Sequence, residues 1–154
     1  MRQSNRAAAA VLRDHGASAM TDVTGFGLIG HLGEMLAASL AAAELDPAAV
    51  PLYPGALELA QAGISSTLLP ENLSLASLLR GTVDAPLRTL LFDPQTSGGL
   101  LAGVPADRAA ACVAALREMY PQAATIGRVT GSVRTAREVA IAVSKATFDQ
   151  RDGL

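Results

Sequence analysis

Residues 21–28 (TDVTGFGL) place one carboxylate and two hydroxyl groups beside two glycines. Gly25 and Gly27 allow positive φ and close approach of another backbone segment. The helix expected after this turn begins with unpaired N–H groups, which favour a bound anion, and Asp22 supplies the carboxylate oxygen that Mg²⁺ prefers. Asp and Thr are also the ordinary caps of a helix N-terminus. The segment alone therefore leaves two interpretations open, a cation and phosphate site or a simple helix cap.

Residues 93–100 (DPQTSGGL) form a second segment of the same kind. Asp-Pro begins a turn, the Thr and Ser hydroxyls bond to local backbone, and paired glycines let the chain reverse into a strand. Nothing in this pattern requires a catalytic carboxylate. A structural turn is the simpler interpretation of this segment.

The elements around these segments can be predicted from periodicity and from Gly and Pro positions. An extended segment over 17–24 leads into the first turn, and apolar residues at helical spacing predict a helix over 26–40. The run 100–104 (LLAGV) predicts a buried strand after the second segment, and a helix over 105–120 begins with Pro at its first position. Further predictions are helices over 2–14, 55–61 and 74–80, a loop over 64–74, and a helix or extended approach over 86–92. Residues 41–46 could extend the preceding helix or begin a strand, and a short strand is favoured. Strands are also predicted over 125–129 and 138–143, followed by a polar, frayed tail over the last ten residues.

Strands and helices are mixed in this order without regular alternation. That pattern predicts an α+β fold, with helices packed on a mixed β-sheet. No repeat or low-complexity linker divides the 154 residues, so we expect residues 1–154 to form a single domain.

Composition excludes several classes of function. Half of the residues are hydrophobic, which is enough for a core, and the net charge is −2 from 12 basic and 14 acidic residues. The basic residues form no cluster, so we expect no nucleic-acid partner. No apolar run reaches the roughly 18 residues of a membrane span, and no signal peptide is visible. We therefore expect a cytoplasmic protein without a membrane partner.

For several single residues a structural role is a simpler interpretation than a functional one. Cys112 lies in an Ala-rich stretch and is expected to be a small buried hydrophobe. His15 is expected in the last turn or loop after the first helix. His31, on the helix after the first turn, is expected to pack or to face solvent, with a metal or acid–base role as the less favoured alternative. Arg80 and Arg88 are expected on the solvated surface, with a phosphate contact as the alternative.

The exact amino-acid sequences of both segments, found together in one chain, add a further argument about function. Residues 21–32 (TDVTGFGLIGHL) resemble the C-terminal signature of the selenophosphate synthetases, also called selenide, water dikinases. Residues 93–101 (DPQTSGGLL) resemble a second signature of the same domain. The helix that bears Asn5, the Pro-rich middle, and the closing helix and strands also fit, so the resemblance covers about residues 1–143.

The resemblance implies a fold, a reaction and one site residue. The fold is the C-terminal domain of the aminoimidazole ribonucleotide synthetase type. The family's enzymes make selenophosphate, AMP and phosphate from ATP, selenide and water, and they require Mg²⁺. Asp22 matches the family's C-terminal metal ligand on the ATP phosphates, whereas the other motif residues are expected only to shape the loop. A homodimer is expected for the full-length protein.

The sequence departs from the full family pattern in one respect. The ATP-binding N-terminal domain, with its glycine-rich segment, nucleophilic Cys or selenocysteine and catalytic Lys, has no counterpart in these residues. Neither Cys112 nor Lys145 lies in a matching motif, and residues 65–72 receive no role. We therefore expect no catalytic residue in this chain, no activity in the chain alone, and an N-terminal ATP-binding domain as its partner.

Two alternatives belong to other classes. A stand-alone binding or interaction module would expose the apolar face that normally meets a partner domain. A different member of the superfamily, such as a thiamine-phosphate kinase or a hydrogenase maturation protein, is the other alternative. The amino-acid sequence of residues 21–28 argues against that second alternative.

Overall fold

The computed structural model describes residues 4–144, and the predicted polar tail and Lys145 lie outside the described residues. Apolar residues at helical spacing and Gly or Pro at the ends account for most of the helices. The α-helices are α1 (Arg6–Asp14), α2 (Gly27–Ser39), α3 (Ala56–Gln61), α4 (Leu69–Asn72), α5 (Ala85–Phe92) and α6 (Ala106–Arg117), with 3-10 turns at Pro47–Ala49, Leu73–Leu78 and Ala136–Glu138.

The strands form two separate sheets. β1 and β4 pair antiparallel as a two-stranded ribbon, and the other strands form a four-stranded sheet in the order β3-β6-β2-β5. In that sheet β3, β6 and β2 run parallel, whereas β5 is antiparallel to β2. The predicted α+β fold with a mixed sheet is therefore confirmed. The strands are β1 (Ala19–Asp22), β2 (Ala41–Leu45), β3 (Leu79–Arg80), β4 (Leu100–Gly103), β5 (Gly127–Ser132) and β6 (Ile141–Val143).

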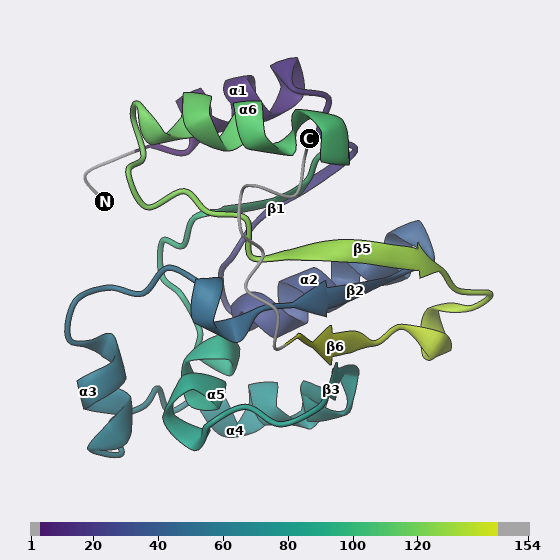
Figure 1. The fold of residues 1–154 in the computed structure, drawn as a ribbon. Helices are drawn as coiled ribbons and strands as arrows, with labels where there is room; N and C mark the ends of the chain where they lie inside the picture. Colours follow the sequence, from purple (N-terminus) through teal and green to yellow (C-terminus); the bar gives the residue numbers. More distant parts are fainter. Residues whose placement is uncertain (1–3, 145–154) are drawn as a thin grey trace.

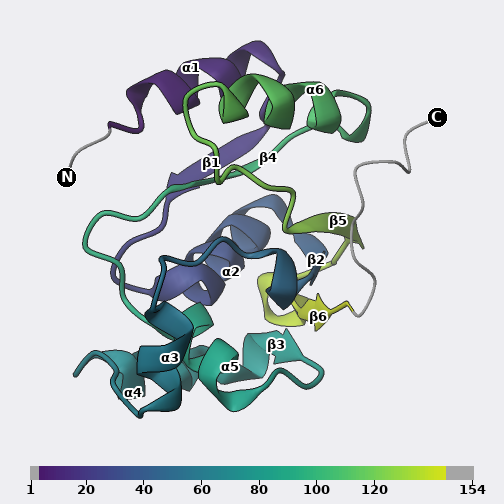
Figure 2. The same ribbon diagram turned by 60° about the vertical axis from the view of Figure 1, so that its left-hand side comes forward.

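Helix α2 lies at the centre of the fold. In both ribbon views α1 and α6 lie side by side above the β1/β4 ribbon, and α2 lies below that ribbon against the four-stranded sheet (Figures 1 and 2). A helix that is apolar on nearly all sides is suited to such a position. α2 also packs on α5, so it contacts β1, the four-stranded sheet and the helix that precedes the second motif.

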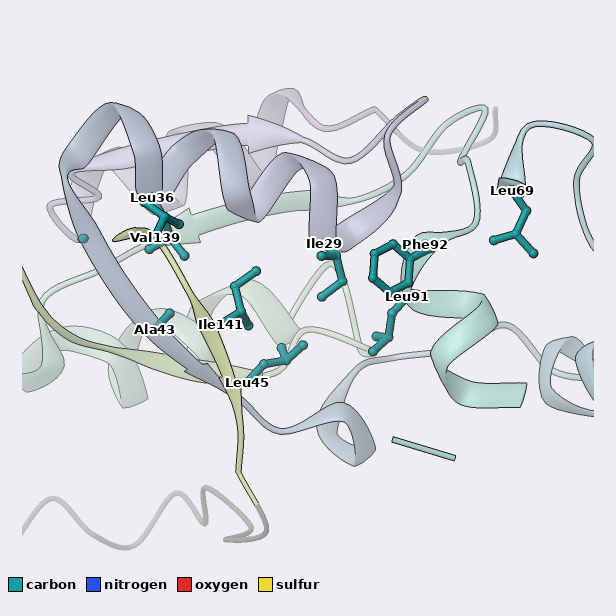
Figure 3. Close-up of a cluster of buried hydrophobic side chains, with 10 residues drawn as sticks. Ile29, Leu36, Ala43, Leu45, Leu69, Leu91, Phe92, Val139 and Ile141 are labelled. Carbon is teal, nitrogen blue, oxygen red and sulfur yellow. The ribbon is translucent and has the colours of Figure 1, made fainter. Parts of the chain in front are cut away.

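The main core lies between α2, α5 and the four-stranded sheet (Figure 3). Its most deeply buried side chains come from segments far apart in the sequence, which makes the core a long-range assembly. Within residues 4–144, every helix is too short or too polar to span a lipid bilayer. The largest fully buried side chains are Phe92, Ile29, Leu45, Leu91, Ile141 and Cys112.

Most predicted elements are confirmed, and the differences concern short ones. The prediction of a loop over 64–74 is wrong in its second half. α4 begins there at Leu69, and the 3-10 turn follows it from Leu73. The helix predicted over 74–80 is a 3-10 turn that gives way to β3. A strand of two residues has no periodicity of its own and is fixed by its pairing with β6. The segment 86–92 is a helix, which settles the alternative left open there.

Candidate functional site

The two motif segments lie side by side. Asp22 is opposite Leu100 in the antiparallel ribbon, and beyond the ribbon the Val23 N–H donates to the Gly99 carbonyl at 3.0 Å. The Gln95 N–H then donates to the Thr24 carbonyl at 2.9 Å. We call residues 21–32 and 93–101 together the paired motifs. Their pairing was not predicted from the sequence, because each segment on its own is an ordinary glycine turn.

Backbone atoms of other segments leave no room for a Cβ at two glycines of the paired motifs. A Cβ at Gly98 would lie 2.0 Å from the Val23 carbonyl oxygen, closer than real Cβ contacts occur. Gly27 has φ of +67° and a Cβ there would meet the backbone of Phe92 at 2.7 Å. The expectation of positive φ is thus confirmed at Gly27, whereas Gly25 does not have positive φ and has open space around it.

Asp22 lies at the end of β1 with its side chain exposed. The N-cap of α2 is Phe26, and no side chain caps this helix, so the helix-cap interpretation of Asp22 and Thr24 is wrong. Among residues 4–144, the Asp22 carboxylate forms no hydrogen bond or ion pair, and no group of three or more His, Cys, Asp or Glu side chains can hold a metal. An exposed, unpaired carboxylate suits a hard cation that brings its other ligands with it.

His31 is buried beside the first turn and is only 8% exposed. Its Nε2 lies 3.2 Å from Thr24 Oγ1, and its Nδ1 lies 3.3 Å from Glu34 Oε2. The Phe26 ring packs against the imidazole with centroids 5.5 Å apart. The expectation of a packed His31 is confirmed, and the contact with Thr24 links it to the motif itself.

Asn72 was missed in the sequence, where residues 65–72 received no role. Its side chain is buried, and its Nδ2 donates to the carbonyls of Gly25 and Phe92, both at 2.9 Å. Asn72 therefore ties the first motif to the segment just before the second. No local pattern marks the buried amide at the end of the short helix α4, so only the long-range contacts reveal this residue.

Asn5 and Asp93 also act as structural ties of the paired motifs. Asn5 does not cap α1 with its side chain, and its Nδ2 instead donates to the Gly98 carbonyl at 3.1 Å. Asp93 Oδ1 accepts the Ser66 N–H at 3.2 Å. This contact agrees with the structural interpretation of the Asp-Pro turn.

The remaining candidates have contacts of their own or are exposed, and none is recorded in contact with Asp22 among the described residues. Cys112 is buried in α6, and burial raises the pKa of its thiol, as expected of an unreactive side chain. His15 follows α1, and its Nδ1 bonds with the Val11 carbonyl at 2.9 Å. Arg88 lies over the Phe92 ring at 5.4 Å, and Arg80 is exposed on β3. The predicted surface position is thus confirmed for Arg80.

Two hollows of the described surface are lined by residues other than Asp22. One of about 420 Å³ lies where β2 and β6 end, with Asp46, Thr82 and Asp84 in its wall. The other, of about 250 Å³, lies between α3 and α5 and includes Asp93. Asp22 lies outside both of these hollows, with its side chain exposed among the described residues.

Comparison with known proteins identifies the family. Residues 1–140 match the family described as AIR synthase related protein, C-terminal domain. The selenide, water dikinase of Porphyromonas gingivalis is 39% identical over 136 residues, which is 86% of this chain and 39% of that protein. The enzymes of the same name from Desulfitobacterium hafniense and Pelobacter propionicus are 40% and 42% identical, over 84% and 81% of this chain and 38% and 37% of theirs.

Solved structures support the fold. The hydrogenase maturation protein HypE superposes with a TM-score of 0.58 at 23% identity, over 92% of this chain and 39% of that one. At that identity the likeness concerns the fold alone. The chain spans less than two fifths of the length of the curated relatives named above. The resemblance seen in the two motifs is confirmed, and the chain belongs to the AIR synthase related protein, C-terminal domain family.

Proposed function

We propose that residues 1–154 form a single domain, the C-terminal domain of a selenophosphate synthetase. The complete enzyme would make selenophosphate, AMP and phosphate from ATP, selenide and water in the cytoplasm, as a homodimer that uses Mg²⁺. The observation that carries the proposal is the exposed Asp22 within the paired motifs, in a chain about 40% identical to selenide, water dikinases.

In this proposal the chain supplies one metal ligand and one wall of an ATP site. The Asp22 carboxylate would meet the Mg²⁺ held on the ATP phosphates, since a single carboxylate does not hold Mg²⁺ well without further oxygen ligands. The uncapped N-terminus of α2 begins five residues after Asp22, and its positive end favours phosphate. The chain alone would have no synthetase activity, because the nucleophile and the other metal ligands belong to an N-terminal ATP-binding domain.

Reconstitution tests this function. The separately expressed N-terminal ATP-binding domain is mixed with this chain, and selenophosphate formation is followed with ATP, Mg²⁺ and selenide. Activity is expected with the wild-type chain and with Asp14→Ala, which removes another exposed carboxylate, and is expected to be lost with Asp22→Ala. Activity with Asp22→Ala would remove Asp22 from the site, and ATP consumption by the chain alone would contradict its predicted inactivity.

A second candidate, an interaction module, is favoured by one observation. Among residues 4–144, five of the nine exposed large hydrophobic side chains lie in residues 53–68, namely Tyr53, Leu57, Leu59, Ile64 and Leu68. Exposed apolar groups in one segment are typical of a surface that meets another protein. Light scattering of the chain at high concentration distinguishes the candidates, since self-association is expected for the module and a monodisperse monomer would count against it.

A further inference from the structure

The hollow of about 420 Å³ lies where three parallel strands end. β2, β3 and β6 run in the same direction, so their carboxyl ends meet at one end of the four-stranded sheet (Figure 1). The wall is formed by residues 46–49 after β2, residues 82–84 after β3, residues 143–144 at the end of β6, and Leu87 of α5. Ligands of sheets with parallel strands commonly bind in the crevice outside the carboxyl ends of those strands. We call this site the strand-end hollow.

Asp46 is the buried acid in the wall of the strand-end hollow, with only 6% of its surface exposed. Its Oδ1 accepts the Ala48 N–H at 2.9 Å, which caps the 3-10 turn Pro47–Ala49. Its Oδ2 forms no hydrogen bond or ion pair with any of residues 4–144. Since no side-chain oxygen among these residues is both fully buried and unpaired, Oδ2 must reach the accessible surface. The hollow is the surface that Asp46 lines, so an unpartnered carboxylate oxygen faces it.

The rest of the wall adds negative charge and apolar surface. Asp84 is the N-cap residue of α5 but makes no side-chain capping bond, and neither its carboxylate nor the Thr82 hydroxyl bonds to another described residue. Among the described residues, the lining contains no Lys, Arg or His, so the wall itself brings no positive charge to the two carboxylates. Val83, Leu87 and Val143 supply the apolar part. A ligand must therefore be cationic on one side and apolar on the other.

The size of the strand-end hollow favours an organic cation over a metal ion. A water molecule takes a share of only about 30 Å³ of liquid volume, whereas ligand pockets commonly measure about 300–1,000 Å³. The hollow, at about 420 Å³, belongs to the second range. Within residues 4–144, no group of three or more His, Cys, Asp or Glu side chains can hold a metal.

We propose that the strand-end hollow binds a small organic ammonium ion. The nitrogen donates to Asp46 Oδ2 with Asp84 close by, and the hydrocarbon part lies on the apolar side chains of the wall. An ammonium group has only donors and an ionised carboxylate has only acceptors, so the two groups match. The lining contains neither Asp22 nor another residue of the paired motifs, so the inference does not rest on the proposed function.

The ligand class is tested with n-butylamine at neutral pH, by NMR of the backbone amides of the ¹⁵N-labelled full chain. Saturable shifts are expected at residues 46–49 and 82–84. n-Butanol has the same hydrocarbon part without the charge, and MgCl₂ supplies a cation without a hydrocarbon part. Neither is expected to give saturable shifts at these residues.

The role of the carboxylates is tested with matched variants. Asp46→Asn removes the charge but keeps an oxygen for the Ala48 N–H, so the cap is retained. The affinity for n-butylamine should fall roughly tenfold, because a hydrogen bond between two ionised groups becomes a weaker one. Asp84→Asn, at an exposed position, should lower it about threefold and gives a second test if Asp46→Asn does not fold. Asp107→Asn makes the same change in the first turn of α6 and should bind like the wild type.

Three outcomes would overturn the inference. The first is the absence of saturable shifts at residues 46–49 and 82–84 of the wild-type chain. The second is equal binding of n-butanol or of Mg²⁺, which would make the site apolar or a metal site. The third is wild-type affinity in both Asp46→Asn and Asp84→Asn. The reconstitution assay with Asp22→Ala follows selenophosphate instead, so either proposal can fail without the other.

Discussion

The paired motifs and the α3 segment, residues 53–68, are held in opposite ways. The paired motifs are fixed by side chains from distant parts of the sequence, such as Asn5 and Asn72, and by backbone bonds between the two motifs. The α3 segment is held mainly by local backbone bonds and by packing of α3 on α5, and no residue of α3 is buried. The backbone of the paired motifs is therefore held in a fixed position. The α3 segment exposes apolar side chains that the rest of the described chain does not cover.

The difference indicates that the two regions have different roles in the proposed enzyme, ligand binding for the paired motifs and contact with another protein for the α3 segment. Long-range polar ties over-determine the position of a loop, which suits a ligand site that must be preorganised. Exposed leucines and isoleucine supply contact area for another protein surface. Substitutions in the two regions should therefore separate stability from association.

Gly98→Ala is expected to have the largest effect. The added Cβ would meet the Val23 carbonyl, which is backbone and cannot swing aside, so the two motifs must separate. We expect a loss of about 3 kcal/mol in the free energy of unfolding, measured by urea denaturation. Gly99→Ala is the matched control, because its Cβ would meet nothing within 4 Å. Equal stability of the two variants would show that the ribbon does not need this close approach.

Asn72→Ala is expected to follow. The change leaves the Gly25 and Phe92 carbonyls without their donor, and Phe92 is fully buried. An unsatisfied buried polar group costs about 1–3 kcal/mol, so we expect a loss of that size in urea denaturation. Ser74→Ala, at an exposed position just beyond Asn72, should stay near the wild-type value. If Asn72→Ala loses no more unfolding free energy than Ser74→Ala, water replaces the amide as the hydrogen-bond donor.

Asn5→Ala tests the weaker tie. It removes one bond to the Gly98 carbonyl at a half-buried position, and an ordinary hydrogen bond contributes about 1 kcal/mol. Hydrogen exchange of the β1/β4 amides is the measurement, with faster exchange expected in that ribbon and little change in β2. Uniformly faster exchange throughout the protein would contradict a local role for Asn5.

The sequence predicted the individual elements of the site better than their assembly. Helix α2 and strands β1 and β4 follow from apolar periodicity and glycine positions, because those signals are local. The Asn72 bonds and the Thr24–His31 contact join residues that local rules treat separately. The helix-cap interpretation of Asp22 was wrong because α2 begins only at Gly27, so that its N-cap is Phe26. β3 could not be predicted because two residues become a strand only through β6.

The smallest effect on stability is expected in the α3 segment. Leu59 and Ile64 are both more than half exposed, so the double variant Leu59→Gln/Ile64→Thr should change the free energy of unfolding by under about 1 kcal/mol. Gln keeps a good helix former in α3 and Thr keeps the branched Cβ, so local backbone preferences are nearly unchanged. The same variant should bind the separately expressed N-terminal domain more weakly, or self-associate less, by calorimetry and light scattering. Leu69→Gln, at a buried position close by, should lose stability instead. If the double variant unfolds as readily as Leu69→Gln, the α3 segment belongs to the core of this chain, and the contrast with the paired motifs fails.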